Sequence, residues 1–362
     1  MSASGPKTSG LNTSGMKASG TAAPGLITPD IPPPVILRAG CKVNLYLRIT
    51  GVRPDGYHEL DTLFLPLPDP CDLLHVTHRA EQGLAFTCTE ADVDPTRNTV
   101  VAAYEGFVAA TGFCPGIAVH LEKHIPHGAG LGGGSADAAV LLRHLAALHA
   151  AQAPDKALTP EALRAIAARV GADVPFFLMD GPARATGIGE VLTPLEPDGL
   201  SALGLAGQHL VLACPPIRVS TPWAYRAWDA ANVTLPGTAC AAAQSTATGK
   251  LAPPGELMVS ALHPVAGQGA KSLRPCLTSE SLEDRNPLSR SPWLTNSFEP
   301  VVFRAHATLR RTKEFLLRRG ASAALMSGSG ASLFALFRNH GTARDVTEAL
   351  RNDNIAVFLH AL

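Results

Sequence analysis

The chain has 362 residues with 30 basic and 30 acidic side chains, so its formal net charge is zero. Apolar residues make up 46% of it and charged residues 17%, which allows a sizeable core, and the length favours two domains. Balanced charge argues against a nucleic-acid binder, which needs a basic surface, and against attachment to anionic lipid by charge alone. We therefore expect no nucleic-acid partner and no membrane partner.

The seven cysteines contain no CxxC pair, which fits neither a disulfide framework nor a zinc site. Reduced thiols in a cytosolic protein are the simplest interpretation. A long uncharged run, residues 199–217, is broken by glycines and a pair of prolines, so a turn and a strand are predicted there rather than a membrane span. No export signal is expected, because the first residues lack a basic start followed by an apolar stretch. The predicted location is cytoplasmic.

The first half of the chain begins with a low-complexity segment. Residues 1–33 repeat Ser-Gly every five residues and carry almost no large apolar side chains, so a disordered tail is predicted. Alternating apolar residues then predict strands at 35–37, 43–49, 60–65, 73–77 and 117–121. Periodic apolar residues and capping signals predict helices at 99–110, from the glycine-rich turn to about 150, and from the N-cap Thr159 to Val170.

The pattern restarts after about residue 190. Residues 232–295 have little periodicity and are predicted to be a long loop or insertion. The other predicted elements are strands at 209–214, 323–326, 333–337 and 355–359, and helices at 299–319 and 342–351. This mixture, with early strands that look paired as hairpins, favours an α+β fold with domains at 34–190 and 191–362.

The strongest motif is the segment from Lys123 to Ala139, KHIPHGAGLGGGSADAA, with five glycines among residues 128–134. Glycines before a helix let backbone N–H groups approach an anion, and the helix N-terminus adds partial positive charge. A phosphate site is therefore predicted; a tight turn without a ligand is the alternative. The glycines also satisfy G-x-G-x-x-G, but residues 152–155, where a dinucleotide domain needs an acidic residue at a strand end, look like a loop entering the next helix. A dinucleotide-binding domain is therefore kept as a minor alternative.

Three shorter segments carry polar residues of interest. Lys42 and Asn44 alternate with apolar residues, so they share one face of a strand, although such a lysine is usually just solvated. Tyr57 and His58 follow an Asp-Gly turn and suit a planar ring such as a base. Asp173 lies in an apolar run, either as a buried carboxylate that needs a partner or as a cap for the turn before proline.

Two further features are weaker. The turn at Ser327–Gly330 could bind phosphate, but a plain turn is the favoured interpretation. His120, His124 and His127 have helical spacing but fall in a predicted strand and loop, so metal binding is not expected.

Taken in order, these segments resemble the GHMP superfamily of small-molecule kinases. Within it they are most similar to the branch that acts on a cytidyl-diphosphate-linked methylerythritol in the non-mevalonate isoprenoid pathway. The matching motifs are CKVNL at 41–45, RPDGYHEL at 53–60, PHGAGLGGGSADAA at 126–139, GADVPFF at 171–177 and MSGSG at 326–330. The resemblance implies a mixed N-terminal sheet-and-helix domain, a ferredoxin-like C-terminal α/β sandwich, and an active site in the cleft between them.

The resemblance also implies a reaction, in which ATP donates its γ-phosphoryl group to the tertiary 2-hydroxyl of the acceptor. Asp173 would take the hydroxyl proton, and Lys42 would keep that carboxylate ionised and orient the hydroxyl. Mg²⁺ is expected to accompany ATP, and no protein side chain is assigned as a metal ligand. The residues expected to hold the ATP phosphates are Pro126, Gly128, Gly130, Leu131, Gly132, Gly133, Gly134 and Ser135.

On the acceptor side, Tyr57 and His58 match the family's cytosine-binding pair, and Tyr225 matches an aromatic residue on the opposite face of the base. Asn44 and Thr221 match polar contacts nearer the methylerythritol and the cytidine. The expected partners are therefore this small molecule and ATP, bound by a monomer or weak homodimer.

Two positions depart from the family's pattern. Ala136 stands where a second serine is usual, and Ser297 stands where an aspartate is usual. Two alternatives are kept: another GHMP kinase acting on mevalonate, homoserine or a sugar, and a non-catalytic nucleotide-binding relative. The RPDGYHEL motif argues against the first, and the presence of both Lys42 and Asp173 argues against the second.

Overall fold

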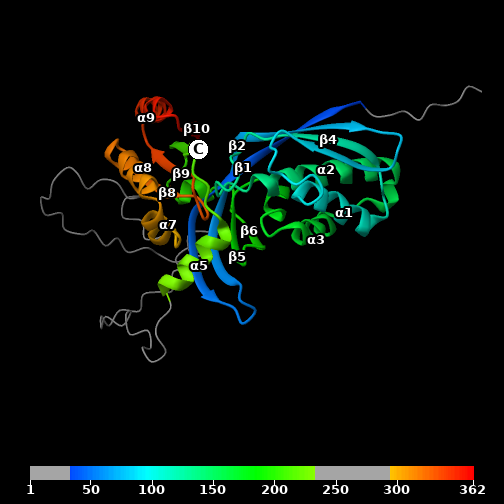
Figure 1. Cartoon of the computed structure of the whole chain (residues 1–362), viewed down its shortest axis with the longest axis horizontal. Coiled ribbons are helices and arrows are strands. Elements are labelled where there is room, and N and C mark those ends of the chain that lie inside the picture. The colour runs from blue at the N-terminus through cyan, green and yellow to red at the C-terminus, as the bar shows by residue number, and fades with distance from the viewer. Residues whose placement is uncertain (1–32, 233–293) are drawn as a thin grey trace, which may run out of the picture.

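The computed structural model describes residues 33–232 and 294–362 (Figure 1). The tail predicted at 1–33, apart from its last residue, lies outside the described residues. So does the insertion predicted at 232–295, apart from its two ends.

The first part of the chain forms a six-stranded sheet around two long antiparallel strands. The second of these strands pairs with two others along its opposite edge, one near each end. The strands are β1 (Val35–Val52), β2 (His58–His78), β3 (Gly83–Cys88), β4 (Gly116–Glu122), β5 (Ala183–Gly187) and β6 (Val191–Pro194). Because β6 pairs with β5 although it follows residue 190, we propose that the domain boundary lies after Pro194.

Strand β1 joins two segments that were expected to be separate strands. The alternation of apolar and polar residues is interrupted between these two segments for two reasons. The pairing register with β2 shifts between Ala39 and Cys41, and the residues around the shift are buried on both faces of the sheet. Gly40 permits this close pairing, since a Cβ there would lie 2.6 Å from the carbonyl oxygen of Leu67. Likewise, β2 joins the strands expected at 60–65 and 73–77.

Helices α1 (Thr99–Thr111), α2 (Gly133–Gln152) and α3 (Pro160–Val170) cover one face of this sheet (Figure 1). The predicted cap is confirmed, because the Thr159 side chain accepts a hydrogen bond from the N–H of Ala162. Short helical turns η1 (Pro154–Lys156) and η2 (Pro175–Leu178) precede and follow α3. All three helices were expected from the sequence, whereas β3, β5 and β6 were not.

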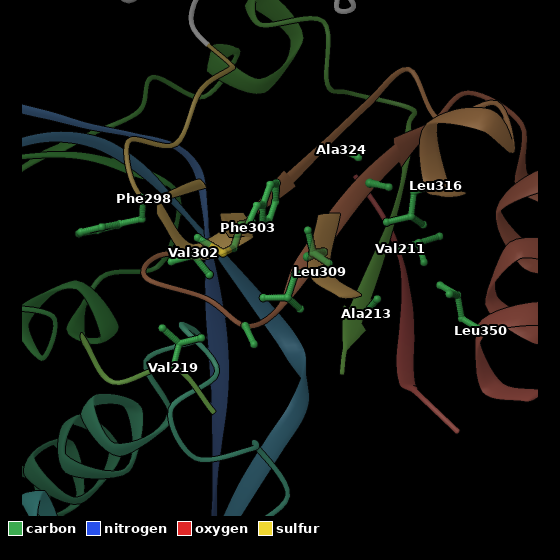
Figure 2. Packing of buried hydrophobic residues seen from close by; sticks show 14 of the residues in the cluster. Val211, Ala213, Val219, Phe298, Val302, Phe303, Leu309, Leu316, Ala324 and Leu350 are labelled. Atoms are coloured by element: carbon green, nitrogen blue, oxygen red, sulfur yellow. The ribbon is translucent and has the colours of Figure 1, made fainter. Parts of the chain in front are cut away.

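The second part forms a four-stranded antiparallel sheet in the order β10-β7-β9-β8. Its strands are β7 (His209–Cys214), β8 (Ala323–Met326), β9 (Leu333–Phe337) and β10 (Ala356–Ala361). Val211 and Ala213 of β7 face the helices of this part (Figure 2). The alternate residues, Leu210 and Leu212, pack with Val43 of β1 in another cluster. The β1–β2 pair therefore lies against the second sheet. This packing places the polar residues of β1 between the two parts of the chain.

The helices of the second part are α4 (Gly199–Ala202), α5 (Thr221–Asn232), α7 (Glu299–Ala305), α8 (Ala307–Arg318) and α9 (His340–Asn352). The single helix expected at 299–319 is wrong, because His306 leaves the helical region with φ −125° and ψ 77°. The break lets Val302 and Leu309 both pack on the same cluster (Figure 2). Within the two described stretches of chain, no helix is long and apolar enough to span a bilayer.

A pair of histidines should make the stability of the first part depend on pH. The rings of His78 and His144 lie 5.9 Å apart, and neither Nε2 atom has a hydrogen-bond partner in the described structure. Burial and the neighbouring ring lower the pKa of His144. The unfolded chain therefore binds more protons below about pH 6.5, and the free energy of unfolding falls as the pH drops through that value.

We expect His144→Phe to weaken this pH dependence. A single proton can change the free energy of unfolding by at most about 1.4 kcal/mol per pH unit, so the difference between the variant and the parent should stay within that limit. Urea denaturation at pH 7.5 and 5.5 measures it. The control variant His340→Asn changes an exposed histidine and should behave as the parent does. If the free energy of unfolding fell by the same amount between pH 7.5 and pH 5.5 in His144→Phe and in the parent, His144 would not be a source of the pH dependence.

Candidate active site

A cavity of about 350 Å³ lies where the two sheets meet. Its walls come from β1 and β2, the glycine-rich loop, the N-terminal end of α5 and the turn between β8 and β9. The predicted site residues that line it are Lys42, Asn44, Pro126, Gly128, Gly130, Leu131, Gly132, Gly133, Gly134, Ser135, Asp173, Thr221 and Tyr225. Residues from both parts of the chain thus meet around one hollow.

The glycine-rich loop needs its glycines for two reasons. Gly128, Gly130 and Gly132 have φ values of 68°, 75° and 74°, in the left-handed region that side chains disfavour. A Cβ on Gly130 would also lie 2.2 Å from the carbonyl oxygen of Ser327. Helix α2 begins directly after, and in the described structure no side chain caps its N-terminus. Its first N–H groups are therefore available to an anion.

Lys42 is buried on β1, with only 4% of its surface exposed. Its Nζ donates a hydrogen bond to Asn44 Oδ1 at 2.7 Å, which confirms that the two side chains share a face. Asn44 in turn donates through Nδ2 to Thr62 Oγ1 at 2.8 Å. The ammonium lies 4.9 Å from the ring centroid of Phe64. These contacts fix a buried cation at the cavity wall, so the solvated alternative is wrong.

Asp173 faces that cation. Its Oδ2 lies 3.6 Å from Lys42 Nζ, although the two residues are 131 positions apart. The carboxylate is less buried than the apolar run predicted, since 32% of the side chain is exposed. The capping alternative is not seen: the turn before Pro175 is closed by a backbone hydrogen bond from the N–H of Val174 to the carbonyl of Gly171 at 3.1 Å, and in the described structure the Asp173 side chain forms no hydrogen bond with it. A carboxylate that is both paired and accessible from the cavity can accept a proton there.

The Ser327–Gly330 turn closes one side of the cavity. Ser327 Oγ donates to the carbonyl of Gly130 at 3.0 Å and accepts from the N–H of Asn44 at 3.1 Å. Ser329 Oγ lies 2.8 Å from Thr221 Oγ1. The favoured interpretation, a turn, is therefore confirmed. It holds the glycine-rich loop and β1 in register.

The two departures from the family's pattern have separate outcomes. Ala136 is buried in the apolar cluster beneath α2, whereas the neighbouring Ser135 lines the cavity. A hydroxyl is therefore kept at the cavity. Ser297 Oγ accepts a hydrogen bond from the N–H of Ile49 at 3.0 Å, so it helps to tie β1 to the second part.

Sequence reasoning missed Lys123, which lines the cavity beside the glycine-rich loop. Its Nζ donates to the carboxylate of Asp72 and, at 2.9 Å, to Asp137 Oδ2. All three side chains are at most 8% exposed. Burial lowers the pKa of Lys123, but the two carboxylates outweigh it and the pKa is raised. Burial raises the pKa of Asp137. An aspartate within the apolar face of α2 was the signal that could have revealed this ion triad.

The expected base-binding residues are arranged at the edge of the cavity. Tyr57 lies in the turn between β1 and β2, is 59% exposed and does not line the cavity. The His58 ring contacts the Tyr225 ring, with centroids 4.5 Å apart and planes tilted by 35°. These two rings therefore do not enclose a base between themselves. A base would have to lie beside the pair, on a face that Tyr57 can reach.

Comparison with known proteins first establishes the class of enzyme to which the chain belongs. The GHMP kinases N terminal domain family matches residues 98–181, and the GHMP kinases C terminal family matches residues 273–356. A solved homoserine kinase from Cytophaga hutchinsonii shares the fold, with TM-score 0.58 and 18% identity over 90% of this chain and 93% of that one. The two family matches define the class: the chain is a GHMP kinase, an enzyme that uses ATP to phosphorylate a small molecule.

Nearer relatives define the family. A 4-diphosphocytidyl-2-C-methyl-D-erythritol kinase from Nitratidesulfovibrio vulgaris (strain DP4) is 48% identical over 91% of this chain and 99% of its own length. The one from Oleidesulfovibrio alaskensis is 46% identical over the same shares. A solved 4-(cytidine 5'-diphospho)-2C-methyl-D-erythritol kinase superposes with TM-score 0.63 at 32% identity, over 90% of this chain and 98% of that one. The chain belongs to the 4-diphosphocytidyl-2-C-methyl-D-erythritol kinase family.

Proposed function

We propose that this chain transfers the γ-phosphoryl group of ATP to the 2-hydroxyl of 4-diphosphocytidyl-2-C-methyl-D-erythritol, giving the 2-phosphate and ADP. The pathway would be the non-mevalonate route to isoprenoid precursors. The observation that carries the proposal is the Lys42–Asp173 pair, 3.6 Å apart in the cavity that the glycine-rich loop also lines. A base, a cation and a phosphate cradle are what transfer to an alcohol requires.

Asp173 is proposed as the general base. A tertiary alcohol is a poor nucleophile, so its proton must leave as the new O–P bond forms. The carboxylate takes that proton while the bond between the γ-phosphorus and the β-bridging oxygen breaks and ADP departs. Lys42 holds that carboxylate in place through the ion pair. Because Asn44 fixes the ammonium at 2.7 Å, the cation is oriented before the substrates arrive.

The glycine-rich loop is proposed to hold the phosphates in line with the acceptor hydroxyl. Backbone N–H groups at the start of α2 would contact the phosphate oxygens, with Ser135 contributing a hydroxyl. Positioning and charge stabilisation account for most of the rate in phosphoryl transfer, because the protein forms no covalent bond to the phosphoryl group. Thr221 and Asn44 are proposed to contact the acceptor.

Mg²⁺ is proposed to arrive with ATP. This ion prefers oxygen ligands and is usually held by substrate phosphates, waters and one or two protein groups. The cavity fits that pattern, since Ser135 and Asp173 both supply oxygen atoms to it. Among the described residues no group of three or more His, Cys, Asp or Glu is placed to hold a metal by itself. When bound, the ion would neutralise charge on the phosphoryl group.

A substrate panel tests the proposal. The full chain is supplied with ATP, Mg²⁺ and either the cytidyl acceptor, mevalonate or homoserine, and ADP release is followed by a coupled assay. We expect turnover on the order of 1–100 s⁻¹ with the cytidyl acceptor only. Phosphorylation of mevalonate or homoserine but not of the cytidyl acceptor would favour a sister kinase. ATP binding without turnover on any acceptor would favour a non-catalytic relative. The cytoplasmic location and the monomer or weak dimer stay predictions.

A further inference from the structure

Helix α5 contacts the turn end of the β1–β2 pair through His58. His58, the first residue of β2, places Nε2 2.6 Å from Asp229 Oδ1 on α5. Its ring also contacts Tyr225, and it meets the edge of Trp228 at a centroid distance of 5.6 Å. Only 9% of the His58 side chain is exposed, although the turn beside it is open to solvent. Figure 1 shows α5 alongside this end of the strands.

The spacing of residues on α5 explains how one helix contacts both the cavity and the expected base-binding residues. Thr221, Tyr225, Trp228 and Asp229 are separated by four, three and one residues, so they share one side of the helix. Thr221 and Tyr225 line the cavity, and Asp229 lies one turn further along, beyond its lining. Asp229 therefore reaches the expected base-binding residues without belonging to the reacting part of the site.

The contact also fixes the chemistry of the imidazole. A carboxylate can only accept hydrogen bonds, so the His58 Nε2 that faces Asp229 must carry the proton. In a neutral ring, the partner of one nitrogen decides the state of the other. When the His58 ring is neutral, Nδ1 therefore keeps its lone pair and accepts a hydrogen bond. A ring held this way is complementary to an amino group and repels a carbonyl oxygen.

We propose that Asp229 is a positioning residue for the nucleobase end of the substrate. It holds His58 in the Nε2–H tautomer and clamps the turn between β1 and β2 onto α5, so that the base meets a fixed pattern of hydrogen-bond groups. That pattern favours a base with an exocyclic amino group, such as cytosine, over one with a carbonyl in its place, such as uracil. The inference rests on the proposed function, because it assumes that a cytidyl group binds beside His58.

Direct binding tests the inference without requiring turnover. CDP and UDP are titrated calorimetrically into the full chain and into Asp229→Asn, whose amide can donate as well as accept and so does not enforce one tautomer. We expect the parent to bind CDP more tightly than UDP, and the variant to lose about tenfold of that preference. Asp229→Glu should recover most of it. ATP affinity should stay within twofold in both variants.

If Asp229 only stabilised the fold, its replacement would change the stability of the protein rather than the tautomer of His58. Nitrogen-15 NMR of the imidazoles reports the tautomer of His58, and thermal unfolding reports stability. Arg226→Gln is the matched control, since Arg226 lies on the same helix and is exposed. An unchanged CDP-to-UDP ratio in Asp229→Asn, or a loss that follows the melting temperature while the Nε2–H tautomer persists, would overturn the inference. If the parent prefers CDP but phosphorylates no cytidyl acceptor, the proposed function fails and the inference about base recognition stands.

Discussion

Replacing Asp173 by Asn is expected to lower kcat by about 10³-fold while ATP affinity stays within about threefold. The amide cannot take the proton of the acceptor hydroxyl, and its similar size keeps the cavity shape. Steady-state kinetics with saturating acceptor gives kcat, and equilibrium binding of ATP gives affinity.

The control for this experiment is Asp180→Asn. Asp180 lies seven residues after Asp173, just beyond η2, but its side chain is 94% exposed and forms an ion pair with Arg143 at 3.3 Å. It should keep kcat within about twofold. Near-normal turnover in Asp173→Asn would refute the assignment of the base, whatever else the chain phosphorylates.

Replacing Lys123 by Met is expected to lower the free energy of unfolding by about 3–5 kcal/mol. The change removes the one cation between Asp72 and Asp137 and leaves two carboxylates in a buried site. Asp72 keeps backbone hydrogen bonds from His124 and Ile125, at 2.6 and 2.8 Å, but Asp137 Oδ1 has no hydrogen-bond partner in the described structure. Urea denaturation measures the loss.

Two further variants make the Lys123 prediction specific. Adding Asp137→Asn to Lys123→Met should restore part of the stability, because one buried charge is then removed. Lys156→Met, in the exposed turn η1, should change the free energy of unfolding by less than about 0.5 kcal/mol. A loss below about 1 kcal/mol in Lys123→Met would show that the triad is not the buried ion cluster described here.

Much of the fold could be predicted because its elements carry local signals. Caps and apolar periodicity placed α1, α2 and α3 to within a few residues, and short apolar runs placed β7, β8 and β9. The strands β3, β5 and β6 were missed because most of their residues are half-buried or exposed, so they carry no continuous apolar run. Strands β7, β8 and β9 are equally short, but nearly all of their residues are buried. The break at His306 could not be foreseen, since both segments of that region are periodic and only packing on a shared cluster separates them.

The candidate site also contains residues that the sequence predicted and residues that only the structure shows. Glycines with positive φ and the residues of the family motifs were visible in the sequence, and most of them line the cavity. Their roles in binding and catalysis stay predictions that the variants above test. The ion triad and the Asp229 contact were not visible, because they join residues far apart in the chain. Lys123 and Asp72 are separated by 51 positions, and His58 and Asp229 by 171. Only folding brings such partners together, so a local signal such as Asp137 in the apolar face of α2 indicates that a partner is needed but not which residue it is.

Phosphorus-31 NMR of the reaction product is the most direct test that the cavity activates a tertiary hydroxyl. The full chain is incubated with ATP, Mg²⁺ and the cytidyl acceptor. Carbon 2 of the acceptor carries a methyl group and no hydrogen, so a phosphate on its oxygen has no three-bond coupling to a proton. We expect one new phosphomonoester singlet for each ADP formed. A doublet or triplet, from phosphate on a secondary or primary hydroxyl, or ADP formed without any phosphomonoester, would contradict it.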